Sequence, residues 1–500
     1  MKNLIALMAT CLAALMTGLE VSSVPVILPS IGHDLRADFD SAQWVMNAYT
    51  IACTSILMVA GTLADRLGRR RVFTASMILF GAASLGCGTA RTMSMLIVYR
   101  VLQGAGGGAM LICLIAILSN AYRDGAERGR AFAIWGIVFG MGLGIGPLFG
   151  GLIASLIGWR WVFLIHGPLT ILTIALVFAT IRESRAAGAH QLDLAGMLSL
   201  SFSVLGLTFF IIEGPQYGFG SSVMLSMAAA ALVSATIFVT VEWLSAHPMV
   251  DFSVFRIPNF TGAIMGSAGV NFSFWPLLIY LPLYFENGIG YDRATTGLIL
   301  LAYTLPALLL PPLGEQLALR YSPRNVIPCG LMLIALGCWA ITLGLALAAP
   351  GWISLLPGCI LTGMGLGLAN TPSSNAATYA VEADRAGMAS GIETTIRYVA
   401  LSLNIALMGL VLLIGVRSSL AHGGGGLDAA HASATAERLL TDGLGNDKIT
   451  VAQQLDRHLA LKRGFETLTV YAGLAALFFA MSSFIAFRCE TSKRTVDQTQ

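Results

Sequence analysis

The chain reads Gly61-Thr62-Leu63-Ala64-Asp65-Arg66-Leu67-Gly68-Arg69-Arg70-Arg71 where one long apolar block, near residues 42–64, gives way to the next, near 72–90. Each block has about the 20 mainly apolar residues that a helix needs to cross a bilayer. The charged residues between the blocks are costly in hydrocarbon and belong in water. This stretch therefore predicts two membrane-spanning helices joined by a tight, charged link.

The composition extends this pattern to the whole chain. Of its 500 residues 56% are hydrophobic and 11% are charged, against roughly 25% charged in an average soluble protein. The mean hydropathy is +0.77, which excludes a cytosolic enzyme and a soluble domain on a single anchor. The net charge of +3, with no sustained basic stripe, gives no reason to expect a nucleic-acid partner. The lipid bilayer is the expected surroundings of an all-α, polytopic membrane protein.

A window of about 19 residues identifies fourteen candidate spans. They lie near 4–28, 42–64, 72–90, 94–118, 131–156, 160–181, 193–213, 222–244, 259–284, 295–318, 325–348, 352–379, 386–410 and 465–487. The first block is too long for a cleaved signal peptide and lacks a small-residue cleavage pattern. We therefore expect it to remain as the first span.

The arginines indicate the orientation of the spans. Loops on the side of the termini hold most of them, and the short loops opposite hold only Arg36, Arg91, Arg160 and Arg293. Because Lys and Arg in short loops stay in the cytoplasm, both termini are predicted to be cytoplasmic. The long connection 417–464 is expected outside, and its length exempts it from the charge rule.

Two further stretches are rich in glycine and lie inside spans. Residues 96–108 read Leu-Ile-Val-Tyr-Arg-Val-Leu-Gln-Gly-Ala-Gly-Gly-Gly, with Arg100 in an otherwise uncharged helix. Residues 140–151 read Gly-Met-Gly-Leu-Gly-Ile-Gly-Pro-Leu-Phe-Gly-Gly. Small residues let helices approach closely, and proline loosens a helix for a hinge, so glycine-mediated packing is an alternative to a special role.

With the loop at residues 61–71, these stretches resemble three signatures of the major facilitator superfamily. Segments 20–29 and 159–168, and two extra spans near 193–213 and 222–244, are similar to its 14-span drug:proton antiporter family. The resemblance implies two six-helix bundles plus two extra central helices. It divides the chain into a first bundle at 1–185, extra helices at 186–257, a second bundle at 258–488 and a tail at 489–500.

The chain departs from the family pattern at three positions. Glu20 stands where the family usually has Asp, which keeps the acid. His166 stands where Asn is common, and its role is left open. Ala318 takes the Asp position of a second loop signature at 314–324, so a charge latch would be asymmetric between the two halves.

Charged residues inside spans are the first candidates for function. At about 1.5 Å of rise per residue, Glu20 lies about 24 Å and Arg100 about 27 Å from the inner ends of their spans. At this shared depth we expect Glu20 to carry the proton and Arg100 to tune its acidity, the alternative being a static ion pair. Glu393 and Arg397, spaced i, i+4, are either a self-neutralising pair or a second cation or proton site.

The resemblance assigns roles to three further groups of residues. A cytoplasmic gate would use Gly61, Asp65, Arg66, Gly68 and Arg69. The antiporter motif would use Gly142, Gly146, Pro147, Gly150 and Gly151. Aromatic and methionine side chains suit a pocket for greasy cations, although most such residues face lipid or the interface. The candidates are Trp44, Tyr49, Phe139, Phe272, Trp275, Tyr280 and Met364.

The expected function is a proton-coupled exporter that works by alternating access on lipophilic, often cationic drugs. Such a protein is a monomer in an inner or plasma membrane and is not an enzyme. The sequence has no ATP-binding motif, cofactor signature or metal-ligand cluster. Two alternatives stay open: an exporter dedicated to one metabolite, such as a self-made antibiotic, a siderophore or an amino acid, and a non-transporting membrane receptor.

Overall fold

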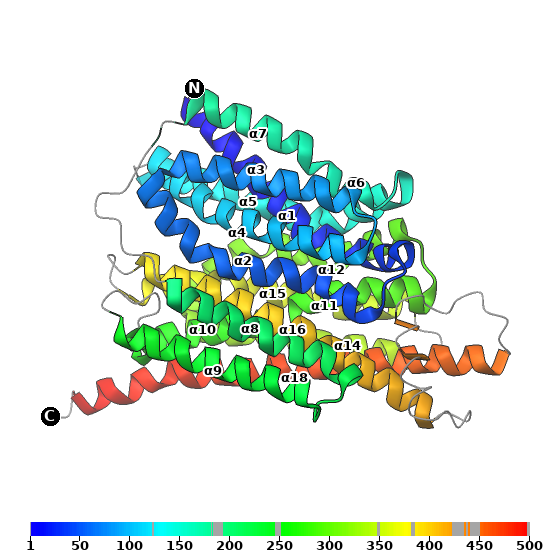
Figure 1. The fold of residues 1–500 in the computed structure, drawn as a ribbon. Coiled ribbons are helices and arrows are strands. Elements are labelled where there is room, and N and C mark those ends of the chain that lie inside the picture. Colours follow the sequence, from blue (N-terminus) through cyan, green and yellow to red (C-terminus); the bar gives the residue numbers. More distant parts are fainter. Residues whose placement is uncertain are drawn as a thin grey trace. The chain divides into compact units, whose positions relative to one another are not determined.

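The computed structural model describes residues 2–122, 125–181, 183, 194–245, 252–347, 351–381, 386–422, 435–436, 439–440 and 451–497. Every regular element in these ranges is a helix (Figure 1). The chain divides into two compact units. Unit 1 comprises Met1–Met249 with Asp292–Gly297, and unit 2 comprises Val250–Tyr291 with Leu298–Gln500.

Unit 1 is built around the first helix. Here α1 packs on α5 and α7, while α4 packs on α2 and α3. The helices of this unit are α1 (Lys2–Leu35), α2 (Phe39–Leu67), α3 (Arg69–Thr89), α4 (Met93–Ala121), α5 (Gly125–Leu156), α6 (Arg160–Leu164), α7 (His166–Thr180), α8 (Leu194–Tyr217) and α9 (Ser222–Leu244).

In unit 2, α14 packs on α15 and on α18. Helix α12 starts within the short segment Asp292–Gly297, which belongs to unit 1, and continues into unit 2 from Leu298. The elements are η1 (Phe252–Arg256), α10 (Pro258–Asn271), α11 (Phe274–Leu283), η2 (Tyr284–Ile289), α12 (Arg293–Leu309), α13 (Pro311–Tyr321), α14 (Pro323–Ala346), α15 (Trp352–Tyr379), α16 (Ala386–His422) and α18 (Val451–Asp497).

The helix pairs of one unit have counterparts in the other. α1 packs on α5 and α7 as α10 packs on α16 and α18, and α3 packs on α4 and α7 as α14 packs on α15 and α18. The pair α2 with α4 corresponds to α13 with α15. The two units therefore share one order of helix packing. The predicted borders at residues 185 and 257 stay predictions.

Twelve helices of the described part are long and apolar enough to cross a membrane, and the count is thirteen if the bent pair of α12 and α13 forms one span. The predicted span 42–64 lies in the 29-residue helix α2, several of whose side chains are outside the described set. The count of fourteen stays a prediction. In the predicted outer loop 417–464, α16 continues to His422 and α18 already begins at Val451, since no proline interrupts residues 451–497.

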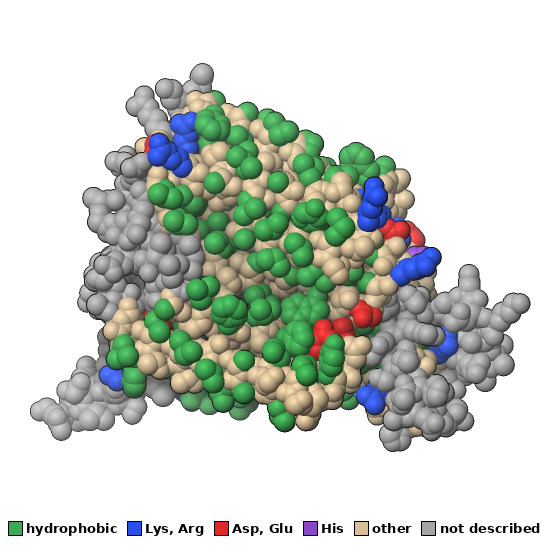
Figure 2. Space-filling view, viewed as in Figure 1, with side chains coloured by type: hydrophobic (Ala, Val, Ile, Leu, Met, Phe, Trp, Pro, Cys, Tyr) green, Lys and Arg blue, Asp and Glu red, His purple; other side chains and the backbone are tan. Residues whose placement is uncertain are grey.

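The outward surface of these helices is apolar. Ile171 is 72% exposed and Leu244 is 81% exposed, which would be unfavourable in water for a surface this extensive. Over unit 1, in the upper part of Figure 2, basic side chains lie near the two ends of the helices and the area between them is mostly apolar. The chain is therefore a membrane-embedded protein.

Candidate functional site

Arg100 is buried at the centre of unit 1, with 1% of its surface exposed. Helix α4 carries it, and the glycines that follow let neighbouring helices come close. A Cβ on Gly106 would lie 2.7 Å from the backbone nitrogen of Phe80 in α3, and one on Gly108 would lie 2.8 Å from the carbonyl oxygen of Cys53 in α2. The glycine run thus packs α4 tightly between α2 and α3 and shields the guanidinium from water.

The carboxylate of Glu20 is the direct partner of this guanidinium. Nη1 of Arg100 donates to Oε1 of Glu20, and both side chains are buried. The other carboxylate oxygen, Oε2, is equally buried and accepts no hydrogen bond within the described part of the chain. A buried oxygen without a donor is costly as an anion. Glu20 is therefore half-satisfied, with one oxygen bound and one left over.

Two further donors of Arg100 bond to α2 and α4. Nε donates to the carbonyl oxygen of Val45 at 2.9 Å, and Nη1 donates to Oε1 of Gln103 at 2.7 Å. The amide of Gln103 in turn donates to Ser84 Oγ in α3 at 2.8 Å. Beneath the guanidinium lies the ring of Tyr49, 4.4 Å from Cζ to the ring centroid. Such a network fixes the guanidinium in one orientation.

His166 brings a third titratable side chain to the site. It is the first residue of α7 and is 1% exposed. Its Nε2 lies 3.7 Å from Oε2 of Glu20. The imidazole packs edge-on against Phe80, with ring centroids 5.4 Å apart. The unbonded oxygen of Glu20, Oε2, therefore lies next to the imidazole of His166.

The predicted antiporter motif holds α5 against the helix that carries Glu20. A Cβ on Gly142 would lie 2.9 Å from the carbonyl oxygen of Leu15, and one on Gly150 would lie 2.8 Å from that of Ser23. Ser22 Oγ donates to the Gly142 carbonyl at 3.1 Å, and Ser23 Oγ donates to that of Gly146 at 2.9 Å. The glycines pack α1 and α5 and so fix the height of the acid.

Pro147 and Gly151 of the same motif contact the start of α12. A Cβ on Gly297 would lie 2.7 Å from the Pro147 carbonyl oxygen, and Arg293 donates to the carbonyl of Ala154 at 3.3 Å. Asp292 precedes this helix, and a hydrogen bond from the Thr295 hydroxyl is the main reason that the pKa of its carboxyl is lowered. The motif thus contacts two helices with one run of small residues.

The charged link between α2 and α3 turns at Gly68, whose φ of 115° is accessible mainly to glycine. Glu183 accepts hydrogen bonds from the backbone N–H groups of Arg70 and Arg71, at 3.1 and 3.2 Å. An acid at a helix N-terminus is favourable. Of the predicted gate, Arg69 begins α3, and the side chains of Asp65 and Arg66 lie outside the described set.

Glu393 and Arg397 lie together on α16, as their spacing predicts. Oε1 of Glu393 accepts from Arg397 Nη2 at 2.6 Å, from Ser267 at 2.6 Å and from Ser374 at 3.1 Å. Arg397 also donates to Ser374 at 2.7 Å. In the described part of the chain, Oε1 of Glu393 thus has an arginine and two serine donors, whereas Oε1 of Glu20 has its arginine alone.

The predicted pocket residues divide between the units. In unit 1, Tyr49 lies under Arg100, Phe139 stacks on Trp135 at 5.9 Å, and the Trp44 indole donates to Glu213 at 3.1 Å. In unit 2, the Tyr280 hydroxyl donates to the Ile405 carbonyl at 2.6 Å. Phe272, Trp275 and Met364 lie in or next to α10, α11 and α15 of that unit. A shared pocket stays a prediction.

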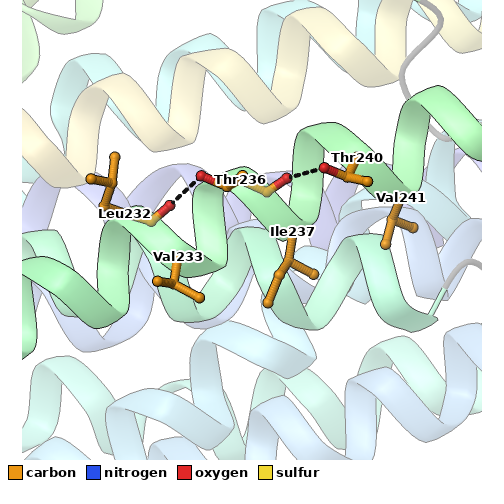
Figure 3. A pocket seen from close by; sticks show the side chains of 6 residues that line it. All are labelled: Leu232, Val233, Thr236, Ile237, Thr240 and Val241. Carbon is orange, nitrogen blue, oxygen red and sulfur yellow. Dashed lines mark hydrogen bonds between the residues drawn. The ribbon is translucent and has the colours of Figure 1, made fainter.

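A shallow hollow runs along one face of α9 (Figure 3). Threonines line it together with aliphatic side chains, but each hydroxyl is bonded within the helix. Thr236 donates to the Leu232 carbonyl at 2.9 Å and Thr240 to that of Thr236 at 2.8 Å. The hollow therefore has the features of a lipid-facing surface. Among the described residues, no group of His, Cys, Asp and Glu is arranged to hold a metal ion.

Comparison with known proteins gives the family. The model of the Major Facilitator Superfamily matches residues 10–405. The chain belongs to the Major Facilitator Superfamily. As members of this superfamily are transporters, the chain is a transporter and not an enzyme.

Relatives of this transporter have resistance and export names. It is 33% identical over 418 residues to the multidrug resistance protein Stp of Mycobacterium tuberculosis, covering 84% of this chain and 77% of that protein. It is 28% identical over 408 residues to the tetracenomycin C resistance and export protein of Streptomyces glaucescens, covering 81% and 75%.

Solved structures share the fold at low sequence identity. A bacterial homologue of the human lysosomal transporter Spinster matches with a TM-score of 0.69 and 16% identity, over 97% of this chain and 98% of the other. A D-xylose-proton symporter matches with a TM-score of 0.61 and 14% identity, over 95% and 96%. The superfamily fold is thus seen over nearly the whole transporter.

Two members of the site were not predicted from the sequence as partners. Gln103 is three residues after Arg100 and so lies on the same face of α4; a polar residue at that spacing was the available signal. His166 stood out only as a departure from the family pattern. Its contact with Glu20 joins α7 to α1, and no spacing along the chain indicates it.

Proposed function

We propose that this superfamily member exports lipophilic, often cationic compounds in exchange for protons, and that Glu20 carries the proton. The relatives named for multidrug resistance support the cargo class. One observation supports the coupling: a buried carboxylate binds its arginine through Oε1, and no described residue donates to its Oε2.

This arrangement gives the acid two states, each with one favourable and one unfavourable feature. Ionised Glu20 is stabilised by Arg100 and by any cation that comes near, but Oε2 stays desolvated. A proton on Oε2 removes that penalty and weakens the attraction for a cationic substrate. Protonation and cation binding then compete, which is the requirement for exchange. One proton moving down 100 mV supplies about 2.3 kcal/mol, enough for a gradient of roughly fiftyfold.

The other assignments follow from the same proposal. We place the transporter in an inner or plasma membrane, as a monomer with both termini in the cytoplasm. The link at residues 61–69 acts as a cytoplasmic gate, and Glu393 with Arg397 is a candidate second cation or proton site. The ion pair between Glu393 and Arg397 supports a structural role at least as well.

A second candidate is an exporter dedicated to one antibiotic. Several relatives are named for single compounds: tetracenomycin C, puromycin and methylenomycin A. This candidate uses the same acid and the same exchange, and it differs only in the breadth of the cargo.

The test is proton movement in vesicles that contain the purified transporter, an internal pH dye and an imposed pH gradient. Addition of ethidium, a lipophilic cation, should speed the loss of the gradient in the wild type and leave it unchanged in Glu20→Gln. Glu213→Gln is the matched control, because its amide oxygen still accepts the Trp44 indole and its flux should equal that of the wild type.

Ethidium-driven flux in Glu20→Gln would exclude this residue as the carrier. Flux with puromycin or another single antibiotic, and none with ethidium, would favour the dedicated exporter. Wild-type vesicles that behave like empty ones with every compound would rule out proton exchange.

A further inference from the structure

The imidazole of His166 lies among hydrogen-bond acceptors. Its Nδ1 is 3.3 Å from the carbonyl oxygen of Phe163, and its Nε2 is 3.3 Å from the carbonyl oxygen of Met16. The same Nε2 is 3.7 Å from Oε2 of Glu20. Each ring nitrogen therefore lies near a carbonyl oxygen, which can only accept.

A neutral imidazole does not fit this environment well. It has one N–H and one lone pair, so one nitrogen would point its lone pair at an oxygen about 3.3 Å away. An imidazolium has two N–H groups and would donate on both sides. Its charge would also offset Oε2 of Glu20, the buried oxygen that receives no hydrogen bond from any described residue.

We propose that His166 is a second proton-binding residue of the site and exchanges its proton with Glu20. This inference rests on the proposed function, since it gives the carrier acid a partner for the proton. In one state His166 is an imidazolium and Glu20 is ionised. In the other, the Nε2–H bond has broken and an Oε2–H bond has formed, which leaves a neutral imidazole and a carboxylic acid.

The ionised state is the better satisfied of the two, because in the neutral state the Nε2 lone pair lies 3.3 Å from the Met16 carbonyl oxygen. After the transfer, Nδ1–H still donates to the Phe163 carbonyl, and Nε2 accepts from the new acid hydroxyl. The Arg100 contact to Oε1 is kept in both states. A small rotation of the carboxylate would shorten the 3.7 Å separation to hydrogen-bond distance.

The other charged or titratable groups around the pair have separate partners. Arg100 of α4 binds Oε1, the Val45 carbonyl and Gln103. Tyr49 of α2 lies against the guanidinium, and Cys87 of α3 approaches Gln103 at 3.7 Å. From α5, the segment against α1 at residues 139–150 brings no ionisable side chain. Arg100 opposes a proton on either partner, and Glu20 attracts one to His166.

The charge on His166 can be measured directly. The full-length transporter is labelled with ¹⁵N-histidine in lipid nanodiscs, and the signal lost in His166→Asn identifies this residue. At about pH 7, near the range in which histidine changes charge, the wild type should show the imidazolium form. Glu20→Gln removes the counter-charge and should reduce that form at least twofold. His33→Asn is the matched control, because His33 is exposed at the end of α1.

Transport gives the second measurement. In His166→Asn the pH at which ethidium-driven proton flux is half-maximal should shift, whereas in His33→Asn it should match the wild type. His166→Gln serves as a second variant if the first does not fold.

A signal that is neutral throughout pH 5 to 8, an imidazolium unaffected by Glu20→Gln, or an unchanged pH profile in His166→Asn would overturn the inference. A charged His166 in a protein without ethidium flux would instead contradict the proposed function alone.

Discussion

Arg100 neutralises the buried carboxylate of Glu20 in unit 1. It is the cation bonded to Glu20, and two further N–H groups donate to Val45 and Gln103. Removal of one partner from a buried ion pair leaves an uncompensated charge, which is far more costly than removal of both. Single and double variants of the pair can therefore separate its contribution to stability from its role in transport.

Arg100→Gln should destabilise the transporter by about 3–5 kcal/mol, because Glu20 is left ionised and buried, or must take up a proton. The double variant Glu20→Gln with Arg100→Gln should recover most of this loss, since no unpaired charge remains. Unfolding by denaturant in detergent micelles measures both. Neither variant should exchange protons for ethidium.

A double variant as unstable as the single one would contradict this account. In that case packing around the guanidinium, for example against Tyr49, would be the larger contribution.

The pairing of Glu20 with Arg100 could be predicted from the sequence, because two opposite charges at similar depth in hydrocarbon attract each other strongly. That Arg100 bonds to only one oxygen of the Glu20 carboxylate could not be predicted from the sequence. It depends on the rotation of the Glu20 carboxylate and on the carbonyls of Met16 and Phe163 near His166. Such details are set by side-chain rotamers and by the meeting of α1 and α7, which leave no periodic signal.

The contact between α1 and α5 depends on having no side chain at three positions of α5. Gly142, Gly146 and Gly150 recur every four residues and face α1. The resemblance assigned these residues to an antiporter motif, and glycine-mediated packing was the alternative. The structure shows close packing at this interface, and a role in exchange stays a proposal that acts through the position of Glu20.

Gly142→Ala should weaken the contact. Its Cβ would lie 2.9 Å from the Leu15 carbonyl oxygen, and because a backbone atom cannot rotate away, the helices must move apart. We expect a loss of about 1–3 kcal/mol in thermal unfolding, with slower ethidium-driven proton flux.

Gly136→Ala on the same helix is the control. No atom lies within 4 Å of a Cβ at that position, so alanine should be neutral or stabilise α5 by up to about 1 kcal/mol. Equal losses in both variants would show that glycine is needed for helix flexibility and not for contact with α1.

The helix boundaries show where the hydropathy pattern fails. It places apolar blocks well, but the break between α6 and α7 just before His166, and the one between α10 and α11 at residues 272–273, fall within single apolar blocks. The 41° bend between α12 and α13 occurs next to Pro311, which has no backbone N–H for the preceding turn. Hydropathy measures burial in lipid and is insensitive to such bends.

The molecule as a whole is enclosed by apolar side chains, and the depth of each one sets its tolerance to charge. Ile171 is 72% exposed near the middle of the span Arg160–Thr180. Leu244 is 81% exposed at the last position of α9.

Ile171→Arg should reduce the amount of transporter in the membrane, because a central arginine costs about 2.5–3.5 kcal/mol for insertion. Leu244→Arg should be tolerated, since a long cationic side chain at a helix end reaches the interface. Quantitative blotting of membrane fractions compares the two. Equal yields would mean that Ile171 does not face hydrocarbon.

The fold class was predictable because spans of about 20 apolar residues dominate the composition. The similarity between the two halves of the chain was harder to predict from the sequence. The second loop signature has lost its acid at Ala318, yet the helix pairs of unit 2 follow the order of unit 1. Packing order survives the loss of a motif, because it depends on many small contacts and not on one charged residue.

The pair α8 and α9 joins the rest of unit 1 in a simple way. α9 packs on α8, α8 packs on α2, and the Trp44 indole bonds to Glu213 across that contact. None of the helix pairs shared by the two units includes α8 or α9. Within the described part of the chain, this hairpin thus contacts the rest of unit 1 mainly through α2. An insertion that adds such a hairpin along one helix can leave the helix pairs common to both units unaltered.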